Sequence, residues 1–213
     1  MKKRSYLTIT LFLIWFCASL NAQQITIPIV VIDPGHGGTD SGAMAINGEK
    51  EKDITLSIAT KIKELYPLIS EKPLELYLTR YTDTLIGLRD RVVLTKQLKA
   101  NVFISIHCNQ ANNASAKGTE IFIYPKSKMQ SKASVLLGQT IQKGLTDALG
   151  IKNRGIKHGN FQVLRDAEAN TASVLLELGF LSQIDESSYL TKEDVHYAIA
   201  LVILQSTLKY LGL

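Results

Sequence analysis

The stretch Val30-Val31-Ile32-Asp33-Pro34-Gly35-His36-Gly37-Gly38 joins an apolar run to a histidine that lies between glycines. Two further apolar runs end in a similar way, since residues 101–106 lead to His107 and residues 173–176 lead to Glu177. Such runs are typical of buried parallel strands, and open α/β sheets bind ligands beyond the carboxyl ends of their strands. One such residue alone could be a packed core histidine or a helix-capping carboxylate. Three at the same kind of position predict a chemical site at one edge of a sheet.

The segments around these runs alternate between strand and helix patterns. We expect helices at residues 53–66, 88–98, 131–149 and 195–211, and strands at 25–33, 74–81, 101–107, 119–124, 161–164 and 173–178. Pro67 is expected to end the first helix, because proline lacks the backbone N–H that a helix needs. This alternation predicts an α/β fold, with a mostly parallel mixed sheet flanked by helices on both faces. No repeat or linker interrupts it, so we expect a single catalytic domain at residues 23–213.

The first 22 residues have the pattern of a secretory signal peptide. Lys2, Lys3 and Arg4 precede an apolar stretch at residues 6–20, and Ala22 offers a small residue for cleavage. An uncleaved membrane anchor is the alternative, because the stretch is long for a signal yet short for a span of about 20 residues. We expect export to the periplasm, the cell envelope or the extracellular space. The signal carries three positive and no negative charges, so cleavage lowers the formal net charge from +5 to +2.

The remaining composition excludes several classes of protein. Hydrophobic residues make up 46% and charged residues 20% of the chain, which is typical of a globular domain. No dense basic cluster with interleaved aromatic residues is present, so we expect no nucleic-acid partner. We also expect no membrane segment once the signal peptide is cleaved. Cys108 is the one cysteine left after cleavage, so no internal disulfide can form. It could be a nucleophile or a soft metal ligand, but a small buried residue is the favoured interpretation.

The residue types at the predicted edge suit a metal site. A catalytic zinc ion takes three protein ligands and keeps a fourth position open. His36 and His107 can supply two of them, and the glycines beside His36 leave space near the ion. Glu51 is the best third candidate, because it lies in the connection that returns from the His36 loop. Glu49 and Asp53 could serve as well, and spacing alone leaves the three open.

Glu177 would then remain free of the metal. A carboxylate beside an activated water can accept its proton and pass it to a leaving amine, which is general acid-base catalysis.

Four ordered segments carry a family resemblance: VVIDPGHGGTDSGA (30–43), EKDITLSIA (51–59), FISIHCN (103–109) and LLELGFLS (175–182). Together they resemble the zinc-dependent N-acetylmuramoyl-L-alanine amidases of the amidase-3 type. Intervening blocks at residues 78–83, 88–91, 118–124 and 154–165 resemble family signatures in the same order. The chain departs from the family at residues 171–173, where proline is common, and at Gln183, where asparagine is common. These departures affect loop detail only.

The resemblance implies roles for four residues. His36, Glu51 and His107 would be the zinc ligands, and Glu177 the catalytic glutamate. The implied reaction is hydrolysis of the amide bond between N-acetylmuramic acid and the L-alanine of the peptidoglycan stem peptide, for wall remodelling, daughter-cell separation or lysis. The alternatives are another zinc peptidase or deacetylase acting on cell-wall fragments, or a non-catalytic peptidoglycan-binding module.

Other polar residues have weaker claims to a role in the site. Arg154 could meet a stem-peptide carboxylate and His158 could touch substrate, although both could be ordinary surface residues. His196 is expected to be packed in the last helix. Arg80 and Arg91 are expected to pair with carboxylates such as Asp83 and Asp90.

The sequence contains few features that indicate how the activity would be regulated. Some family members carry an inserted helix that blocks the zinc, and we expect none at residues 109–117 or 127–154 beyond the helix that the fold needs. The chain shows no wall-binding repeat, so we expect peptidoglycan to bind in the catalytic groove itself, or an envelope protein to recruit or activate the enzyme.

Overall fold

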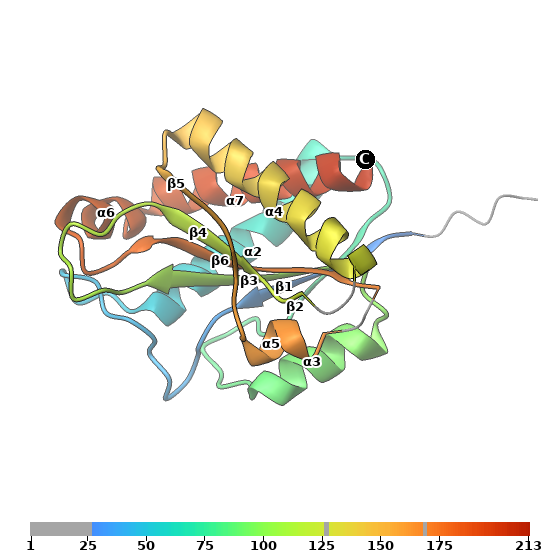
Figure 1. The fold of residues 1–213 in the computed structure, drawn as a ribbon, viewed down its shortest axis with the longest axis horizontal. Coiled ribbons are helices and arrows are strands. Elements are labelled where there is room, and N and C mark those ends of the chain that lie inside the picture. Colours follow the sequence, from blue (N-terminus) through green and yellow to red (C-terminus); the bar gives the residue numbers. More distant parts are fainter. Residues whose placement is uncertain (1–26, 126–127, 168–169) are drawn as a thin grey trace, which may run out of the picture.

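The computed structural model describes residues 27–125, 128–167 and 170–213, so the predicted signal peptide lies outside the described residues. A six-stranded sheet forms the centre of the fold, in the order β2-β1-β3-β6-β4-β5 (Figure 1). The strands are β1 (Ile29–Pro34), β2 (Glu75–Leu78), β3 (Val102–Asn109), β4 (Thr119–Ile123), β5 (Asn153–His158) and β6 (Ala172–Phe180). The first four strands of that order run parallel, whereas β4 is antiparallel to β6 and parallel to β5. The sheet is therefore mixed and mostly parallel, as the sequence predicts.

Helices cover both faces of the sheet. They are α2 (Glu51–Ile69), α3 (Leu88–Gln97), α4 (Lys128–Leu149), α5 (Gln162–Arg165), α6 (Ile184–Leu190) and α7 (Glu193–Leu211). In Figure 1, α4 and α7 lie on one side of the sheet, and α3 and α5 lie on the other. Helix α2 packs against α7 and β1. Within the described ranges, no helix is long and apolar enough to cross a membrane.

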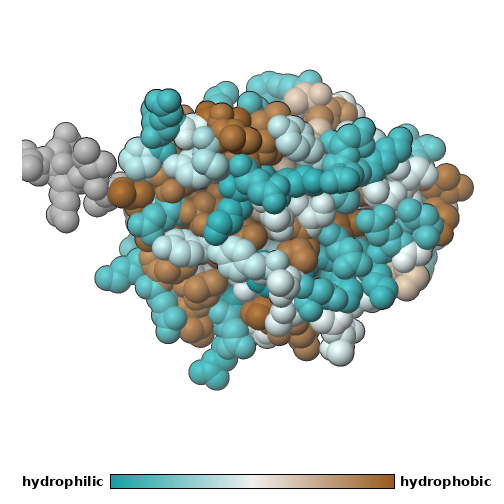
Figure 2. Space-filling model, turned by 180° about the vertical axis from the view of Figure 1, so that it is seen from behind, coloured by the Kyte–Doolittle hydropathy of each residue, from teal (hydrophilic) through white to brown (hydrophobic). Residues whose placement is uncertain are grey.

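Two apolar clusters hold these layers together. The larger includes Ile104 and Ile106 of β3 and lies under α2, α4 and α7. The smaller includes Phe103 of the same strand and lies on the α3 and α5 side. Neighbouring residues of a strand point to opposite faces, so a strand that is buried on both faces is apolar along its whole length. This explains why β1, β3 and β6 are recognisable as continuous apolar runs. Figure 2 shows small apolar groups among hydrophilic ones on the outer surface, as is usual for a globular domain.

The predicted strand at residues 161–164 is wrong. These residues lie in and next to the short helix α5, and the strand beside β4 is β5 instead. Strand β5 is half-buried at the edge of the sheet, with the polar sequence Asn-Arg-Gly-Ile-Lys-His, so it lacks the apolar run that identifies a buried strand. The aromatic ring of Phe161 packs instead against Phe122 of β4, with ring centroids 5.1 Å apart.

The expected end of the first helix at Pro67 is also wrong. Helix α2 contains Pro67 in its last turn and continues to Ile69. Proline has no N–H to donate to the carbonyl group four residues earlier, which here belongs to Lys63, an exposed residue. Water can satisfy an exposed carbonyl group, so the helix tolerates proline there.

A buried ion pair anchors the end of β1. Asp33 and Arg91 are 1% and 3% exposed, and Arg91 Nη1 lies 2.7 Å from Asp33 Oδ1. Arg91 also donates to the carbonyl oxygens of Pro34 and His36, at 2.8 and 2.7 Å. Ser105 donates to the second oxygen of the Asp33 carboxylate at 2.7 Å. Helix α3 is thus tied to the loop that carries His36.

The expected carboxylate partners of the two arginines are wrong, although both arginines have structural roles. Arg91 pairs with Asp33 rather than Asp90. Arg80 is 3% exposed and donates to the carbonyl oxygens of Pro34, Gly35, Lys52 and Thr82. Asp83 is bound by Lys52, at 2.6 Å. Both arginines also donate to backbone carbonyl groups of the loop, and no sequence pattern reveals such partners.

Replacing Arg91 with methionine should lower the free energy of unfolding by about 3–5 kcal/mol, because the buried Asp33 charge loses its partner. Urea denaturation with and without the substitution measures the change. Arg89→Met provides the control, since Arg89 is exposed on the same helix. Equal effects of the two substitutions would show that the buried pair has no special importance.

Candidate metal centre and catalytic site

His36 lies in a tight loop directly after β1. Its backbone φ is 60°, and those of Gly37 and Gly38 are 128° and 58°. A non-glycine residue rarely adopts the left-handed region, so the surrounding contacts must hold His36 there. Arg91 does so through the His36 carbonyl oxygen. Asp40 Oδ2 lies 2.8 Å from His36 Nδ1, which fixes the ring and leaves Nε2 facing the cavity.

Glu51 is the first residue of α2 and is 3% exposed. The backbone N–H of Ala43 donates to its Oε2, and that of Cys108 donates to its Oε1, at 2.8 and 2.9 Å. Oε1 also lies 3.0 Å from His36 Nε2 and 2.9 Å from His107 Nδ1. Burial opposes ionisation, but hydrogen bonds with His107 and His36 prevail and lower the pKa of Glu51 to about 2. The side chain is therefore a carboxylate at neutral pH.

The three side chains converge on one point. Ligand atoms of His36, Glu51 and His107 all lie within 4.8 Å of one another, and they form the one such cluster among the residues that the structure describes. His36 Nε2 and His107 Nδ1 are 3.2 Å apart. Asp53 is exposed, and neither it nor Glu49 joins the cluster. Among the three carboxylates that spacing left open, the fold brings Glu51 to the two histidines.

Gly35 leaves the space that the His107 ring occupies. A Cβ at Gly35 would lie 2.3 Å from His107 Cε1. Gly42 has a similar role on the other side, since a Cβ there would lie 2.5 Å from both Glu51 Oε2 and His36 Cδ2. The glycines therefore admit the imidazole and carboxylate groups to the centre of the cluster.

Replacing Gly35 with alanine should displace the His107 ring and weaken zinc binding by at least about tenfold, because ligand orientation sets metal affinity. Competition against a chromophoric chelator measures the affinity, and circular dichroism checks the fold. Gly48→Ala is the control for backbone strain without a clash: its φ of 88° disfavours alanine, but a Cβ there meets no atom within 4 Å, so we expect some loss of stability and unchanged zinc affinity. An unchanged zinc affinity in Gly35→Ala would contradict the assignment of His107 to the metal centre.

Glu177 lies beside the cluster on the neighbouring strand. It is the register partner of His107, so both side chains leave the sheet on the same face. Its Oε2 is buried and has no hydrogen-bond partner among the described residues. Burial raises the pKa of Glu177 to about 7 despite the opposing effect of His107, and the Glu51 and Glu120 carboxylates add to the rise. A carboxyl group with a pKa near neutrality can both accept and donate a proton.

The raised pKa predicts a stability effect in metal-free protein. The folded state prefers protonated Glu177, so its contribution to stability is present below pH 4.5 and is lost as the pH rises toward 7. Glu177→Gln, which is neutral at every pH, should raise the free energy of unfolding by about 2–3 kcal/mol at pH 8 and very little at pH 4. Urea titrations in chelator at both pH values measure this. Glu71→Gln, at an exposed position, is the control.

The cluster opens into a cavity of about 650 Å³. Its lining includes the polar side chains of His36, Glu51, His107 and Glu177 and the apolar side chains of Leu85, Ile86, Leu88, Phe161 and Val163. The cavity thus lies between the His36 loop, the start of α3 and the start of α5. A volume of this size accommodates a ligand of several residues or sugar units beside the polar groups.

The remaining predicted residues lie outside the cluster. Arg154 and His158 are on β5 and do not line the cavity. Cys108 is 4% exposed, burial raises the pKa of its thiol, and its backbone N–H is the group that contacts Glu51. His196 is 4% exposed and bonds with the Ser57 hydroxyl and the Leu190 carbonyl oxygen. The prediction that His196 is packed is confirmed.

Sequence reasoning did not identify Asp40 as the partner of His36. Asp40 lies four positions after His36 in the sequence, and this spacing was the available signal. The backbone bridge between Gly37 and Asp40 brings the Asp40 carboxylate to the His36 ring. Lys52 was also overlooked. Its ammonium group donates to the Gly38 carbonyl oxygen and to Asp83, and so braces the glycine loop.

Comparisons with known proteins identify the family. Residues 30–208 match the family model Amidase_3, described as N-acetylmuramoyl-L-alanine amidase. The catalytic domain of the amidase CwlV from Bacillus (Paenibacillus) polymyxa var. colistinus superposes with a TM-score of 0.79 at 36% identity, covering 87% of this chain and 99% of that one. The CwlD amidase from Clostridioides difficile, in complex with the GerS lipoprotein, gives 0.77 at 32% identity, covering 87% and 98%.

The probable cell wall amidase LytH of Staphylococcus saprophyticus is 30% identical over 190 residues, which are 89% of this chain and 60% of LytH. The chain thus spans less than two thirds of the length of such curated relatives. The family match covers residues 30–208, so it begins in β1, ends in α7 and includes Glu177 and the three residues of the cluster. By sequence and fold, the chain belongs to the amidase-3 family of N-acetylmuramoyl-L-alanine amidases.

Proposed function

We propose that this chain hydrolyses the amide bond between the lactyl group of N-acetylmuramic acid and the L-alanine of the stem peptide in peptidoglycan. The observation that carries the proposal is the convergence of His36, Glu51 and His107 beside the unpartnered carboxyl group of Glu177 in one cavity. Family membership supports the choice of bond, since the matching model and the similar structures are named as amidases for it.

The donor set fits a zinc ion. Two imidazoles and one carboxylate are a known ligand set of catalytic zinc, with a further position open for water or substrate. Asp40 orients His36 from behind, as carboxylates do for metal-binding histidines. Glu51 is ionised at neutral pH, so it brings the negative charge that a divalent cation needs. His36 Nε2, Glu51 Oε1 and His107 Nδ1 are the atoms that would hold the ion.

Bound zinc would supply Lewis-acid chemistry, which polarises an amide carbonyl and lowers the pKa of water. The protein supplies the proton transfers. Ionised Glu177 would accept a proton from the attacking water and, once protonated, would give it to the nitrogen of the leaving L-alanine. Burial raises the pKa of Glu177 to about 7 in the metal-free protein, and a cation bound at the neighbouring cluster would lower it and favour the ionised form that accepts the proton.

The place of action follows from the same proposal. The cell wall lies outside the cytoplasm, so the proposed substrate requires export, and residues 1–22 have the pattern of a signal peptide. We propose that the enzyme acts in the periplasm or cell envelope on peptidoglycan. Residues 109–117 contain no helix that could act as an inhibitory plug. The CwlD amidase from Clostridioides difficile forms a complex with the GerS lipoprotein. We propose that an envelope protein likewise binds this chain and recruits or activates it.

Mass analysis of fragments released from purified peptidoglycan tests the proposal. The protein without residues 1–22 is assayed with zinc, with chelator, and as Glu177→Ala. We expect intact stem peptides with a free L-alanine amine, together with glycan that retains its lactyl groups, from the zinc sample alone. Shortened peptides on an unbroken lactyl amide would indicate a peptidase instead, and release of acetate would indicate a deacetylase.

A further inference from the structure

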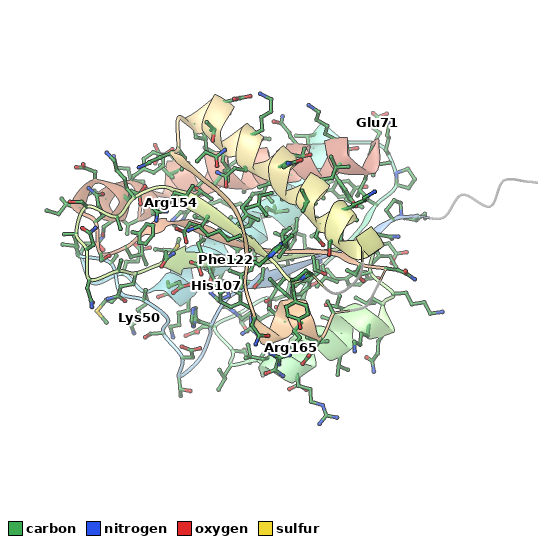
Figure 3. The ribbon with its side chains drawn as sticks, viewed as in Figure 1. Lys50, Glu71, His107, Phe122, Arg154 and Arg165 are labelled. Atoms are coloured by element: carbon green, nitrogen blue, oxygen red, sulfur yellow. The ribbon has the colours of Figure 1, made fainter. Side chains whose placement is uncertain are left out.

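A row of ionisable residues crosses four strands of the sheet, beyond the proposed metal centre. His107 of β3 is paired with Glu177 of β6, and Glu177 is paired with Glu120 of β4. On β5, the register shifts so that two residues, Arg154 and Gly155, lie opposite Glu120. Gly155 has a φ of 86°, which suits such a bulge. Residues directly opposite each other share one face of the sheet, so the row continues from the metal centre toward β5. Figure 3 labels the two ends of this row, His107 and Arg154.

Two cations end this row. Glu120 is 5% exposed, and its Oε1 accepts hydrogen bonds from Arg154 Nε and from Lys157 Nζ, the latter at 2.7 Å. Its Oε2 accepts from Asn109 Nδ2 at 3.3 Å, and Asn109 lines the cavity. Burial opposes ionisation of Glu120, but the bonds from Lys157 and Arg154 lower its pKa. One carboxylate thus faces two cations, and the group carries a net positive charge.

Both cations keep donors for a ligand. Among the described residues, nothing accepts a hydrogen bond from Arg154 Nη2, and Lys157 Nζ uses one of its three protons. Their side chains are 29% and 41% exposed, so these donors face solvent. Arg154 is fixed by the Lys117 carbonyl oxygen and lies over the Phe180 ring, 5.1 Å from its centroid. Donors held in place by a buried carboxylate are preorganised to bind an anion.

The position relative to Glu177 identifies the anion. Under the proposed function, Glu177 protonates the leaving amine, so the stem peptide lies on its side of the scissile bond. Strand β5 is two strands away, or roughly 10 Å, since neighbouring strands are about 4.8 Å apart. An extended peptide covers up to about 3.5 Å per residue, so its second or third residue would reach β5.

We propose that Arg154 and Lys157, held by Glu120, form a subsite for a carboxylate on the second or third residue of the stem peptide. The subsite gives the enzyme a means of distinguishing stem peptides with a free carboxylate from amidated ones. The proposal rests on the proposed function, because that function sets the direction of the peptide.

The kinetic test uses two soluble muramoyl peptides that differ only in whether the second- and third-residue carboxylates are free or amidated. For the free acid, Lys157→Gln should raise KM by about tenfold or more and change kcat little, because a charge-assisted bond is lost on binding while Arg154 still pairs with Glu120. For the amidated peptide, the same variant should change KM less than about twofold. Lys157→Arg should restore binding, and Lys143→Gln, in an exposed ion pair of α4, should have no effect.

A binding test is independent of cleavage. The free stem peptide is titrated calorimetrically into the zinc-loaded protein and its variants, and we expect about tenfold weaker binding in Lys157→Gln and for the amidated peptide. If binding depends on the carboxylate but no cleavage occurs, the proposed subsite stands and the proposed amidase function is wrong. If Lys157→Gln weakens the binding of the free and the amidated peptide equally, or weakens neither, the subsite proposal is wrong even if the amidase function holds.

Discussion

Replacing Glu177 with glutamine should lower the rate of amide hydrolysis at least a thousandfold and leave zinc affinity within about threefold of the original. General acid-base catalysis by one residue contributes roughly 10²–10⁴ to a rate, and here one residue would serve in both directions. Glutamine keeps the size of the side chain but cannot accept the proton. Because Glu177 Oε2 has no hydrogen-bond partner among the described residues, the substitution breaks no protein contact of that atom.

Single-turnover kinetics on a soluble muramoyl peptide measure the chemical step, and a competition titration measures zinc. Glu64→Gln, on the exposed face of α2, is the control and should retain full activity. Activity of Glu177→Gln within tenfold of the original would move the proton transfers to another group. A parallel loss of zinc would instead show that Glu177 acts through the metal centre.

The sequence predicts the arrangement of the candidate residues well where that arrangement follows directly from strand geometry. His36, His107 and Glu177 each end an apolar run, and parallel strands with that pattern must bring their carboxyl ends to one edge. The structure shows this arrangement, with His107 and Glu177 in register. The fold class could be predicted for the same reason, since alternating helix and strand patterns permit few other architectures.

Prediction was weaker where long-range contacts decide the outcome. Glu49, Glu51 and Asp53 have similar local surroundings in the sequence, and only the bonds from Ala43 and Cys108 direct Glu51 into the cavity. Strand β5 pairs with β4 and has one apolar residue, Ile156, that packs against the core, so periodicity could not reveal it. The partners of Arg80 are backbone carbonyl groups, which any residue carries.

Glu51 provides the second large effect. Glu51→Gln should weaken zinc binding by at least about a hundredfold, and activity at limiting zinc should fall by a similar factor. The physical reason is charge: Glu51 is 3% exposed, carries a pKa of about 2, and is the one carboxylate in the cluster that the described residues form. Glutamine has nearly the same shape but carries no negative charge to neutralise the cation. If its side-chain amide turned over, the amide nitrogen rather than the oxygen would face the imidazoles.

Glu49→Gln makes the decisive comparison, because it removes the same charge two residues away at a position outside the cluster. Zinc content by atomic absorption and affinity by chelator competition should separate the two variants, with Glu49→Gln indistinguishable from the original protein. Excess zinc should then restore part of the activity of Glu51→Gln, because its proton-transfer group, Glu177, is intact. If excess zinc restores nothing while zinc is shown to be bound, Glu51 must orient the reacting groups as well as hold the ion. If Glu49→Gln loses zinc instead, the ligand assignment is wrong.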